Sequence, residues 1–218
     1  MAETPEDRDR VYRLRYLCYR RDEAIDARDD ERFQDRYDSM PNHFSFLARA
    51  ANDEPVGTVR ISVVRPEAGW EIAPSHSVFG DVPAFQQIAR GSFVEASRLC
   101  LPQQARRDSL LRVISYMAAL ADFYEVEWLV ACPRVEHSHT YEKLFGFRRC
   151  AEPRQYYGVK FSTTLLAVPR LQLRQYACAS KHMDTARNQA LAHLESGSAL
   201  LPLLAGPRSH AEEHVVSR

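Results

Sequence analysis

The 218-residue sequence has no net charge, no long apolar run and no regular cysteine spacing. Lys and Arg together number 29, as do Asp and Glu, which disfavours nucleic acid or an anionic membrane surface as the main partner. No stretch approaches the roughly 18 apolar residues that a membrane-spanning helix needs. The charged start MAETPEDRDR lacks the apolar core of a signal peptide, so we expect a cytoplasmic protein.

The five cysteines are odd in number and scattered, and no two stand at metal-ligand spacing. This pattern favours reduced thiols over a disulfide framework or a zinc centre. His137 and His139 flank Ser138, but at a helix start they would point to different faces, and no third ligand is evident. We therefore expect no metal site.

What the sequence does contain is enough apolar residues, 45%, for one sizeable core with a small appendage. Hydrophobic periodicity predicts helices over residues 6–27, 83–90, 109–124, 138–145 and 183–195. It predicts strands over residues 43–51, 56–64, 92–101, 127–132, 147–150 and 158–168. Segments 28–41 and 65–82 are predicted as loops, and the first is long enough to be functional.

The order of these elements predicts an α+β domain. The turn Asn-Asp-Glu-Pro splits the first two strands into a hairpin, and a later strand–helix–strand crossover places two strands side by side and parallel. Residues 1–168 form the predicted main domain. Residues 169–218 are predicted to be a helical extension with a frayed tail.

The segment SFVEASRLCL, residues 92–101, places Glu95 and Arg98 among apolar and small residues. A charge in such a run is costly to desolvate unless it is paired. Either the two charges are paired, or they line a wet cleft, and both alternatives indicate a site.

Four short motifs follow one another along the first half of the sequence. They are Arg15 and Tyr19 four apart in the first helix, Asp35 and Asp38 in DRYD, Arg60 in VGTVRIS, and Glu95 with Arg98 in EASRLC. Further on, HSHTYEKLFGFRR carries Tyr141 ahead of Gly146 and Phe147. Together these motifs resemble the long-chain N-acyl amino acid synthases and the related acyl-homoserine-lactone synthases, over about residues 11–165.

The resemblance implies the GCN5-related N-acetyltransferase fold, a mixed and mostly antiparallel sheet flanked by helices, here with an extra C-terminal helical segment. It implies an N-acyltransferase that moves a long-chain acyl group to the amine of an amino acid. The donor would be the thioester of an acyl carrier protein or of coenzyme A, with no tightly bound cofactor. Two rivals stay open: an acyl-homoserine-lactone synthase using S-adenosylmethionine, and a non-catalytic module that binds acyl chains or a carrier protein.

Acyl transfer to an amine needs a base near the amine and a group that serves the leaving thiolate. Glu95 is the candidate base, and its alternative is a structural salt bridge with Arg98 or Arg60. Tyr141 is the candidate acid, and its alternative is packing. The substrate-binding candidates, by resemblance, are Arg15, Tyr19, Asp35, Asp38, Arg60 and Arg98. Among them, Arg60 and Arg98 suit the carboxylate of the acceptor, and the alternative is that they are exposed strand arginines. By resemblance, Asp35 and Asp38 help to form the amino-group end of the site, with a solvated charged loop as the alternative. Arg15 could pair with one of these aspartates.

The sequence differs from ordinary acetyltransferases in one place and from the lactone synthases in another. Ordinary acetyltransferases follow the central strand with a glycine-rich loop whose amides hold pyrophosphate, whereas LPQQARRDS has no glycine. We expect Arg106 and Arg107 to contact a single phosphate instead. A single phosphate is what the phosphopantetheine arm of a carrier protein presents. The lactone synthases also carry a tryptophan after the first helix, and none stands there.

Overall fold

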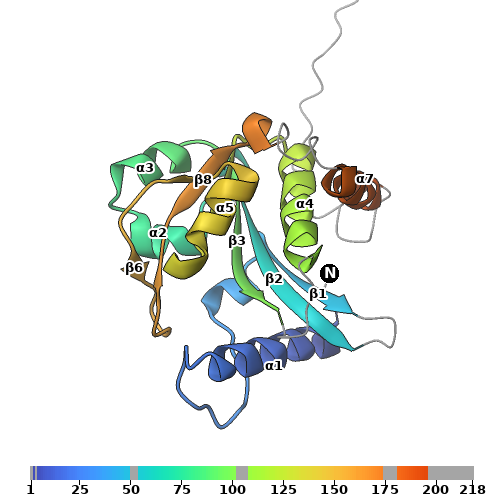
Figure 1. Cartoon of the computed structure of the whole chain (residues 1–218), viewed down its shortest axis with the longest axis vertical. Coiled ribbons are helices and arrows are strands. Elements are labelled where there is room, and N and C mark those ends of the chain that lie inside the picture. The colour runs from blue at the N-terminus through green and yellow to red at the C-terminus, as the bar shows by residue number, and fades with distance from the viewer. Residues whose placement is uncertain (1, 3, 50–53, 102–107, 174–180, 196–218) are drawn as a thin grey trace, which may run out of the picture.

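The computed structural model describes residues 2, 4–49, 54–101, 108–173 and 181–195 (Figure 1). The main sheet has the order β1-β2-β3-β4-β8-β5. Its strands are β1 (His43–Arg49), β2 (Pro55–Val64), β3 (Phe93–Cys100), β4 (Trp128–Ala131), β5 (Arg148–Arg149) and β8 (Leu166–Pro169). A second sheet pairs β6 (Arg154–Gln155) with β7 (Ser162–Thr163).

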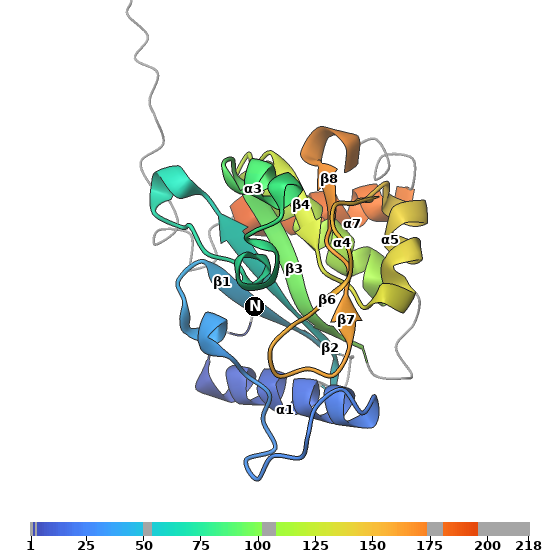
Figure 2. The ribbon, with the colours of Figure 1, turned by 90° about the vertical axis from the view of Figure 1, so that its left-hand side faces the viewer.

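Helices cover both faces of this sheet. They are α1 (Pro5–Arg21), α2 (Pro74–Phe79), α3 (Pro83–Ala89), α4 (Asp108–Phe123), α5 (Ser138–Phe145) and α7 (Lys181–Glu195). Short 3-10 helices are η1 (Arg36–Ser39), η2 (Pro66–Ala68) and η3 (Val135–His137). Helices α4 and α7 lie on one side of the sheet and α2 and α3 on the other (Figure 1). Helix α1 lies across the ends of β1, β2 and β3 (Figure 2).

The predicted α+β plan is confirmed. Strands β1, β2 and β3 are antiparallel neighbours, and the crossover through α4 places β4 parallel to β3. Pairing of β3 with β4 ends at Ala96 opposite Ala131, although β3 continues to Cys100. Strand β4 ends at Ala131, so residues 97–100 of β3 have no strand partner on this side among the described residues. We call this unpaired edge the opening between β3 and β4.

Strand alternation gives the sheet two unlike faces. Val59, Ile61 and Val63 of β2 point into the core under α4, together with Val94 of β3. The intervening residues, such as Arg60, face the other way. One face is therefore continuous core, and the other carries polar side chains close to α1 and α2.

Three of the predicted boundaries are wrong. The first helix ends at Arg21 rather than at residue 27, because Asp22 caps it and Glu23 takes a left-handed conformation at φ 53°. The predicted loop 65–82 contains helix α2, which begins at Pro74, a favoured first residue of a helix.

The third error is the single strand predicted over residues 158–168. Gly158 turns the chain at φ 80°, a conformation that glycine adopts without steric cost. The segment then splits into β7, which pairs with β6, and β8, which pairs with β4 and β5. Helix α5 ends at Gly146 as predicted, at φ 70°.

The C-terminal helix α7 packs against α4. Its Ala190 and Leu194 are buried in the same core as α4, and Arg187 lies 3.4 Å from Asp122 of α4. The division of the chain at residue 168 stays a prediction, and the predicted frayed tail lies outside the described residues. Within the described ranges, no helix is both long and apolar enough to cross a bilayer.

Candidate active site

Polar side chains form two rows across β1, β2 and β3, on the face opposite α4. The cross-strand neighbours are His43, Ser62 and Glu95 in one row and Ser45, Arg60 and Ser97 in the other. All but Ser45 and Ser97 are buried. A buried sheet face made of polar groups is costly unless each group has a hydrogen-bond or ion-pair partner. We therefore expect each of these side chains to have such a partner.

Five charged side chains, which we call the Arg–Asp cluster, gather around Arg60 in the second of these rows. Its members are Arg15, Asp35, Asp38, Arg60 and Arg98. Arg15 lies 2.7 Å from Asp38, Arg60 lies 2.6 Å from Asp35 and 3.2 Å from Asp38, and Arg98 lies 2.8 Å from Asp35. The cluster joins α1, the DRYD turn, β2 and β3, so the charge pairs fix four segments at one place. It confirms that Arg15 pairs with an aspartate.

The DRYD turn explains the spacing of the two aspartates. Asp35 precedes η1 and accepts a hydrogen bond from the backbone N–H of Tyr37, while Asp38 accepts one from the N–H of Asp35. This reciprocal capping box fixes the turn. The three-residue spacing of Asp35 and Asp38 allows this capping, and each carboxylate also contacts an arginine side chain.

The electrostatics of the Arg–Asp cluster favour the ionised form of Asp35. Burial opposes the charge on Asp35, but the Arg60 and Arg98 guanidiniums outweigh it and hold the pKa of that carboxyl well below its usual range. The three guanidiniums exceed the two carboxylates by one positive charge. The cluster therefore has one positive charge available for an anionic group.

Arg98 reaches the cluster because β3 bulges there. Arg60 pairs with Ser97 and Thr58 with Cys100, so two residues of β3 oppose one of β2, and Arg98 adopts φ 54°. Its guanidinium lies 4.4 Å from the ring of Phe33 and 5.7 Å from that of Tyr19. These aromatic contacts hold the arginine at the edge of the site.

Glu95 is separate from the Arg–Asp cluster, so the alternative of a structural salt bridge with Arg98 or Arg60 is not what the structure shows. Its side chain is completely buried. Its Oε2 accepts hydrogen bonds from the hydroxyl and the backbone N–H of Ser75, at 2.5 and 3.1 Å. Its Oε1 has no hydrogen-bond partner within the described residues. Helix α2 therefore fixes one carboxylate oxygen and leaves the other available.

The surroundings of Glu95 change its acidity. Burial raises the pKa of Glu95 to about 7, against the opposing effect of the Ser75 hydrogen bonds and of Arg60. Glu95 lies one residue before Ala96, where β3 and β4 separate. A carboxyl that gains or loses a proton near neutral pH thus lies next to the opening in the sheet.

The other predicted site residues divide by location. Tyr141 lies on the opposite side of the sheet, in the core under α4, near the rings of Phe145 and Phe147. Burial raises its pKa to about 12. Arg106 and Arg107 lie outside the described residues.

Sequence reasoning missed Ser75, because it lies in a segment predicted as a loop. The Pro74 start signal for a short helix was the one cue that could have located it. Among the described residues, no three His, Cys, Asp or Glu side chains gather as a metal site would require.

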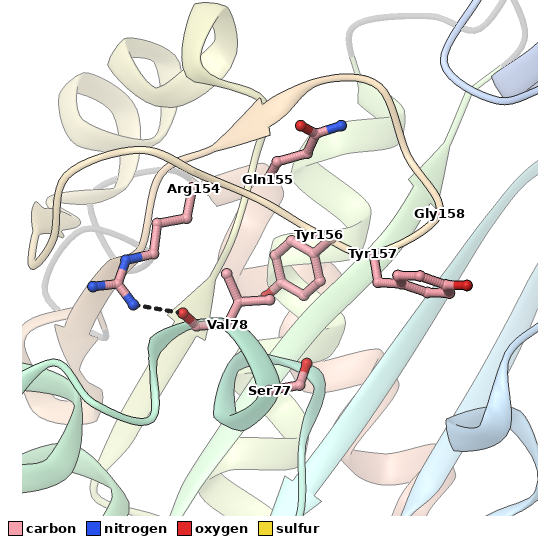
Figure 3. Close-up of a pocket in the computed structure, with 7 residues that line it drawn as sticks. All are labelled: Ser77, Val78, Arg154, Gln155, Tyr156, Tyr157 and Gly158. Atoms are coloured by element: carbon pink, nitrogen blue, oxygen red, sulfur yellow. Dashed lines mark hydrogen bonds between the residues drawn. The ribbon is translucent and has the colours of Figure 1, made fainter.

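A groove of about 530 Å³ lies between α2 and the turn that joins β6 to β7 (Figure 3). Its lining residues are Ser77, Val78, Arg154, Gln155, Tyr156, Tyr157 and Gly158. Arg154 donates to the carbonyl of Val78, and the ring of Tyr156 lies beside Val78 (Figure 3). Glu95 is not among the lining residues, so this groove is distinct from the site at the strand opening.

The split sheet and its flanking helices define the GCN5-related N-acetyltransferase fold. A Lactobacillus plantarum protein assigned as an N-acetyltransferase superposes with a TM-score of 0.51 at 14% identity, over 76% of this chain and 92% of that chain. The coenzyme A-dependent acyl-homoserine lactone synthase BjaI, solved with MTA, gives 0.56 at 15% identity, over 82% and 90%. FeeM, an N-acyl amino acid synthase from uncultured soil microbes, gives 0.65 at 15% identity, over 79% and 96%.

The sequence itself matches the family model of the N-acyl amino acid synthase FeeM over residues 10–169. The chain therefore belongs to the FeeM family of N-acyl amino acid synthases and is an N-acyltransferase. No curated protein matches the sequence.

Proposed function

We propose that this enzyme transfers a long-chain acyl group from a carrier-protein or coenzyme A thioester to the α-amine of an amino acid. The observation that carries the proposal is Glu95. It is a fully buried carboxyl with one oxygen held by Ser75, one oxygen without a partner, and a pKa of about 7. It lies beside the opening between β3 and β4.

The acidity of Glu95 suits deprotonation of an amine. An α-amino group has a pKa of roughly 8, whereas an ordinary glutamate, at roughly 4, is too weak a base to take its proton readily. Raising the pKa of Glu95 to about 7 brings the two groups close to balance. The unpartnered Oε1 is the atom that would accept the proton as the amine attacks.

The opening between β3 and β4 supports thioester binding at this point. Beyond Ala96, the side of β3 that faced β4 has no strand partner among the described residues. Backbone N–H groups at such an edge can bind the oxyanion of a tetrahedral intermediate. Tyr141 remains the proposed acid for the leaving thiolate, and its pKa of about 12 keeps it protonated at neutral pH.

The Arg–Asp cluster supports an amino acid as the acceptor. Its one excess positive charge favours a carboxylate, and Arg98 is its most exposed arginine, with 13% of the side chain accessible. An acceptor whose carboxylate approaches Arg98 and whose amine approaches Glu95 would bridge both polar rows. Asp35 and Asp38 set the positions of these arginines and stay candidates for the amino-group end of the site.

For the donor, we propose the phosphopantetheine arm of an acyl carrier protein, with acyl-coenzyme A as the alternative. The support is the glycine-free segment LPQQARRDS, in which Arg106 and Arg107 would hold a single phosphate. Both donors supply the same thioester. The proposed location of the reaction is the cytoplasm.

The test incubates the purified enzyme with long-chain acyl carrier protein or acyl-coenzyme A and a panel of amino acids, followed by mass spectrometry. We expect an N-acyl amino acid that is missing when Glu95→Gln replaces the wild type. Adding S-adenosylmethionine tests the alternative, since release of methylthioadenosine and an acyl lactone would assign a lactone synthase. Absence of any N-acyl amino acid with every donor would refute the proposal.

A further inference from the structure

A second polar atom without a hydrogen-bond partner lies near Glu95. The hydroxyl oxygen of Tyr156 is buried and has no hydrogen-bond partner within the described residues. The ring itself is half-buried and lines the groove beside α2 (Figure 3). Tyr156 therefore separates this groove from the interior, with its polar end inside.

Helix α2 brings Tyr156 and Glu95 together. Ser75 of α2 binds Glu95, and Phe79, four residues later, lies 6.3 Å from the ring of Tyr156 between centroids. Residues four apart share one face of a helix and are about 6 Å apart along its axis. The same short face thus contacts both side chains.

The end of strand β4 is a second place where residues next to Glu95 and Tyr156 meet. Val130 is the register partner of Glu95, and Cys132 directly follows the end of β4. Cys132 and Tyr156 pack against the apolar cluster that contains Val130 and Phe79. Burial raises the pKa of the Cys132 thiol and of the Tyr156 hydroxyl most, and the nearby Glu95 carboxylate raises both further. Two independent elements therefore place Glu95 and Tyr156 around the opening at the end of β4.

The hydrogen-bonding capacity of this pair indicates its ligand. A carboxylate oxygen accepts, and the oxygen of a phenol also has lone pairs that can accept. A neutral primary amine has two N–H donors and one lone pair. Two fixed acceptors would bind both N–H groups and turn the lone pair towards the thioester.

We propose that Tyr156 is a substrate-binding residue that accepts a hydrogen bond from the acceptor amine and so completes, with Glu95 Oε1, a two-point amine site. The proposal rests on the amine chemistry of the enzyme and on the role proposed for Glu95. It does not depend on which amine is used. Burial keeps the phenol protonated, because it raises the pKa of Tyr156 well above its usual value.

The test compares Tyr156→Phe with the wild type on a primary amine acceptor and on its N-methyl counterpart, which has only one N–H when neutral. We expect kcat/KM for the primary amine to fall about tenfold in Tyr156→Phe, the size of one lost hydrogen bond to a polar group. The rate with the N-methyl amine should stay unchanged, so the preference for the primary amine falls by the same factor. A purely structural change would lower both rates together.

The matched control is Tyr157→Phe, because Tyr157 is the next residue and is fully exposed. It should leave both rates unchanged, and KM for the acyl donor should be unchanged in both variants. An unchanged primary-amine rate in Tyr156→Phe, with or without a faster N-methyl reaction, would overturn the proposal. An equal fall in both rates would overturn it too.

Simple alkylamines are included as acceptors so that two failures stay distinguishable. If amino acids are inert but propylamine is acylated, the proposed acceptor class is wrong and the Tyr156 comparison proceeds with propylamine. If nothing is acylated, calorimetry of propylamine binding decides. Weaker binding to Tyr156→Phe than to wild type supports the two-point site, and equal or absent binding refutes it.

Discussion

Replacing Glu95 by glutamine should inactivate the enzyme and, at alkaline pH, stabilise it. A glutamine cannot accept the proton of the amine, and loss of a positioned general base costs roughly 100-fold or more in turnover. Its side-chain carbonyl can still accept the Ser75 hydrogen bonds. The substitution therefore removes the charge and keeps the contacts with α2.

The size of the stability gain follows from the shift in acidity. The pKa of Glu95 rises from 4.5 to about 7 on folding, so the folded state binds a proton that the unfolded state has released. The stability linked to this group is complete below about pH 4.5 and is lost as the pH rises to about 7. At about 1.4 kcal/mol per pKa unit, the loss between pH 5 and pH 8.5 is about 2 to 3 kcal/mol.

The assay is urea unfolding of both proteins at about pH 5 and pH 8.5, combined with turnover across that range. Glu95→Gln should lack the 2 to 3 kcal/mol decline of the wild type. Wild-type kcat/KM should rise with pH through an inflection near 7, as Glu95 loses its proton. Glu71→Gln, a change at an exposed glutamate just before α2, is the matched control and should behave as wild type in both assays.

Two results would refute this reasoning separately. Turnover of Glu95→Gln equal to the wild type would make Glu95 a structural residue. A stability difference that is the same at both pH values would mean that folding does not raise the pKa of this carboxyl, whatever its role in turnover.

Three further predictions concern the neighbours of this group and the C-terminal helix. Asp35→Asn should cost about 3 kcal/mol of unfolding free energy at neutral pH, because it removes the carboxylate partner of Arg98 and leaves Arg60 with Asp38 alone. The cost should shrink below about pH 4, where the wild-type carboxyl takes up a proton on unfolding, and a pH-independent cost in urea unfolding would contradict this. Ser75→Ala should lower kcat/KM at pH 7 about tenfold and move the pH–rate inflection above 7, because the variant lacks the Ser75 hydroxyl hydrogen bond that favours the ionised form of Glu95. An unmoved inflection would count against this prediction. Leu194→Ala should cost about 2 kcal/mol in thermal unfolding, against under about 0.5 kcal/mol for the exposed Leu171→Ala, and equal costs would show that α7 contributes no core.

Most of the fold could be predicted from the sequence because its signals are local. The apolar alternation of β2 and the helical period of α4 depend on near neighbours in the chain, and Gly146 alone ends α5. The failures lie where local signals are weak or compete. Helix α2 is only six residues long, and the run before β8 is apolar enough to predict one strand although Gly158 turns the chain.

The site divides in the same way. The pairing of Arg15 with one of the aspartates of DRYD could be predicted, because both belong to the ordered motifs that carry the resemblance. The partner of Glu95 could not, since the sequence offered only Arg98 or Arg60 as ion-pair partners. A bulge turns Arg98 towards Asp35 instead, and α2, twenty residues before Glu95, supplies Ser75.

The sequence by itself determined that a carboxylate and an arginine would lie in an apolar strand of an α+β domain with the motifs of an acyltransferase family. Only the tertiary structure decided that Arg98 pairs with Asp35 while Glu95 keeps one oxygen without a hydrogen-bond partner and a pKa of about 7. The physical reason is that acidity depends on burial and on the distances between charges. Both are set by the packing of α2, the DRYD turn and β3, which are distant in the chain.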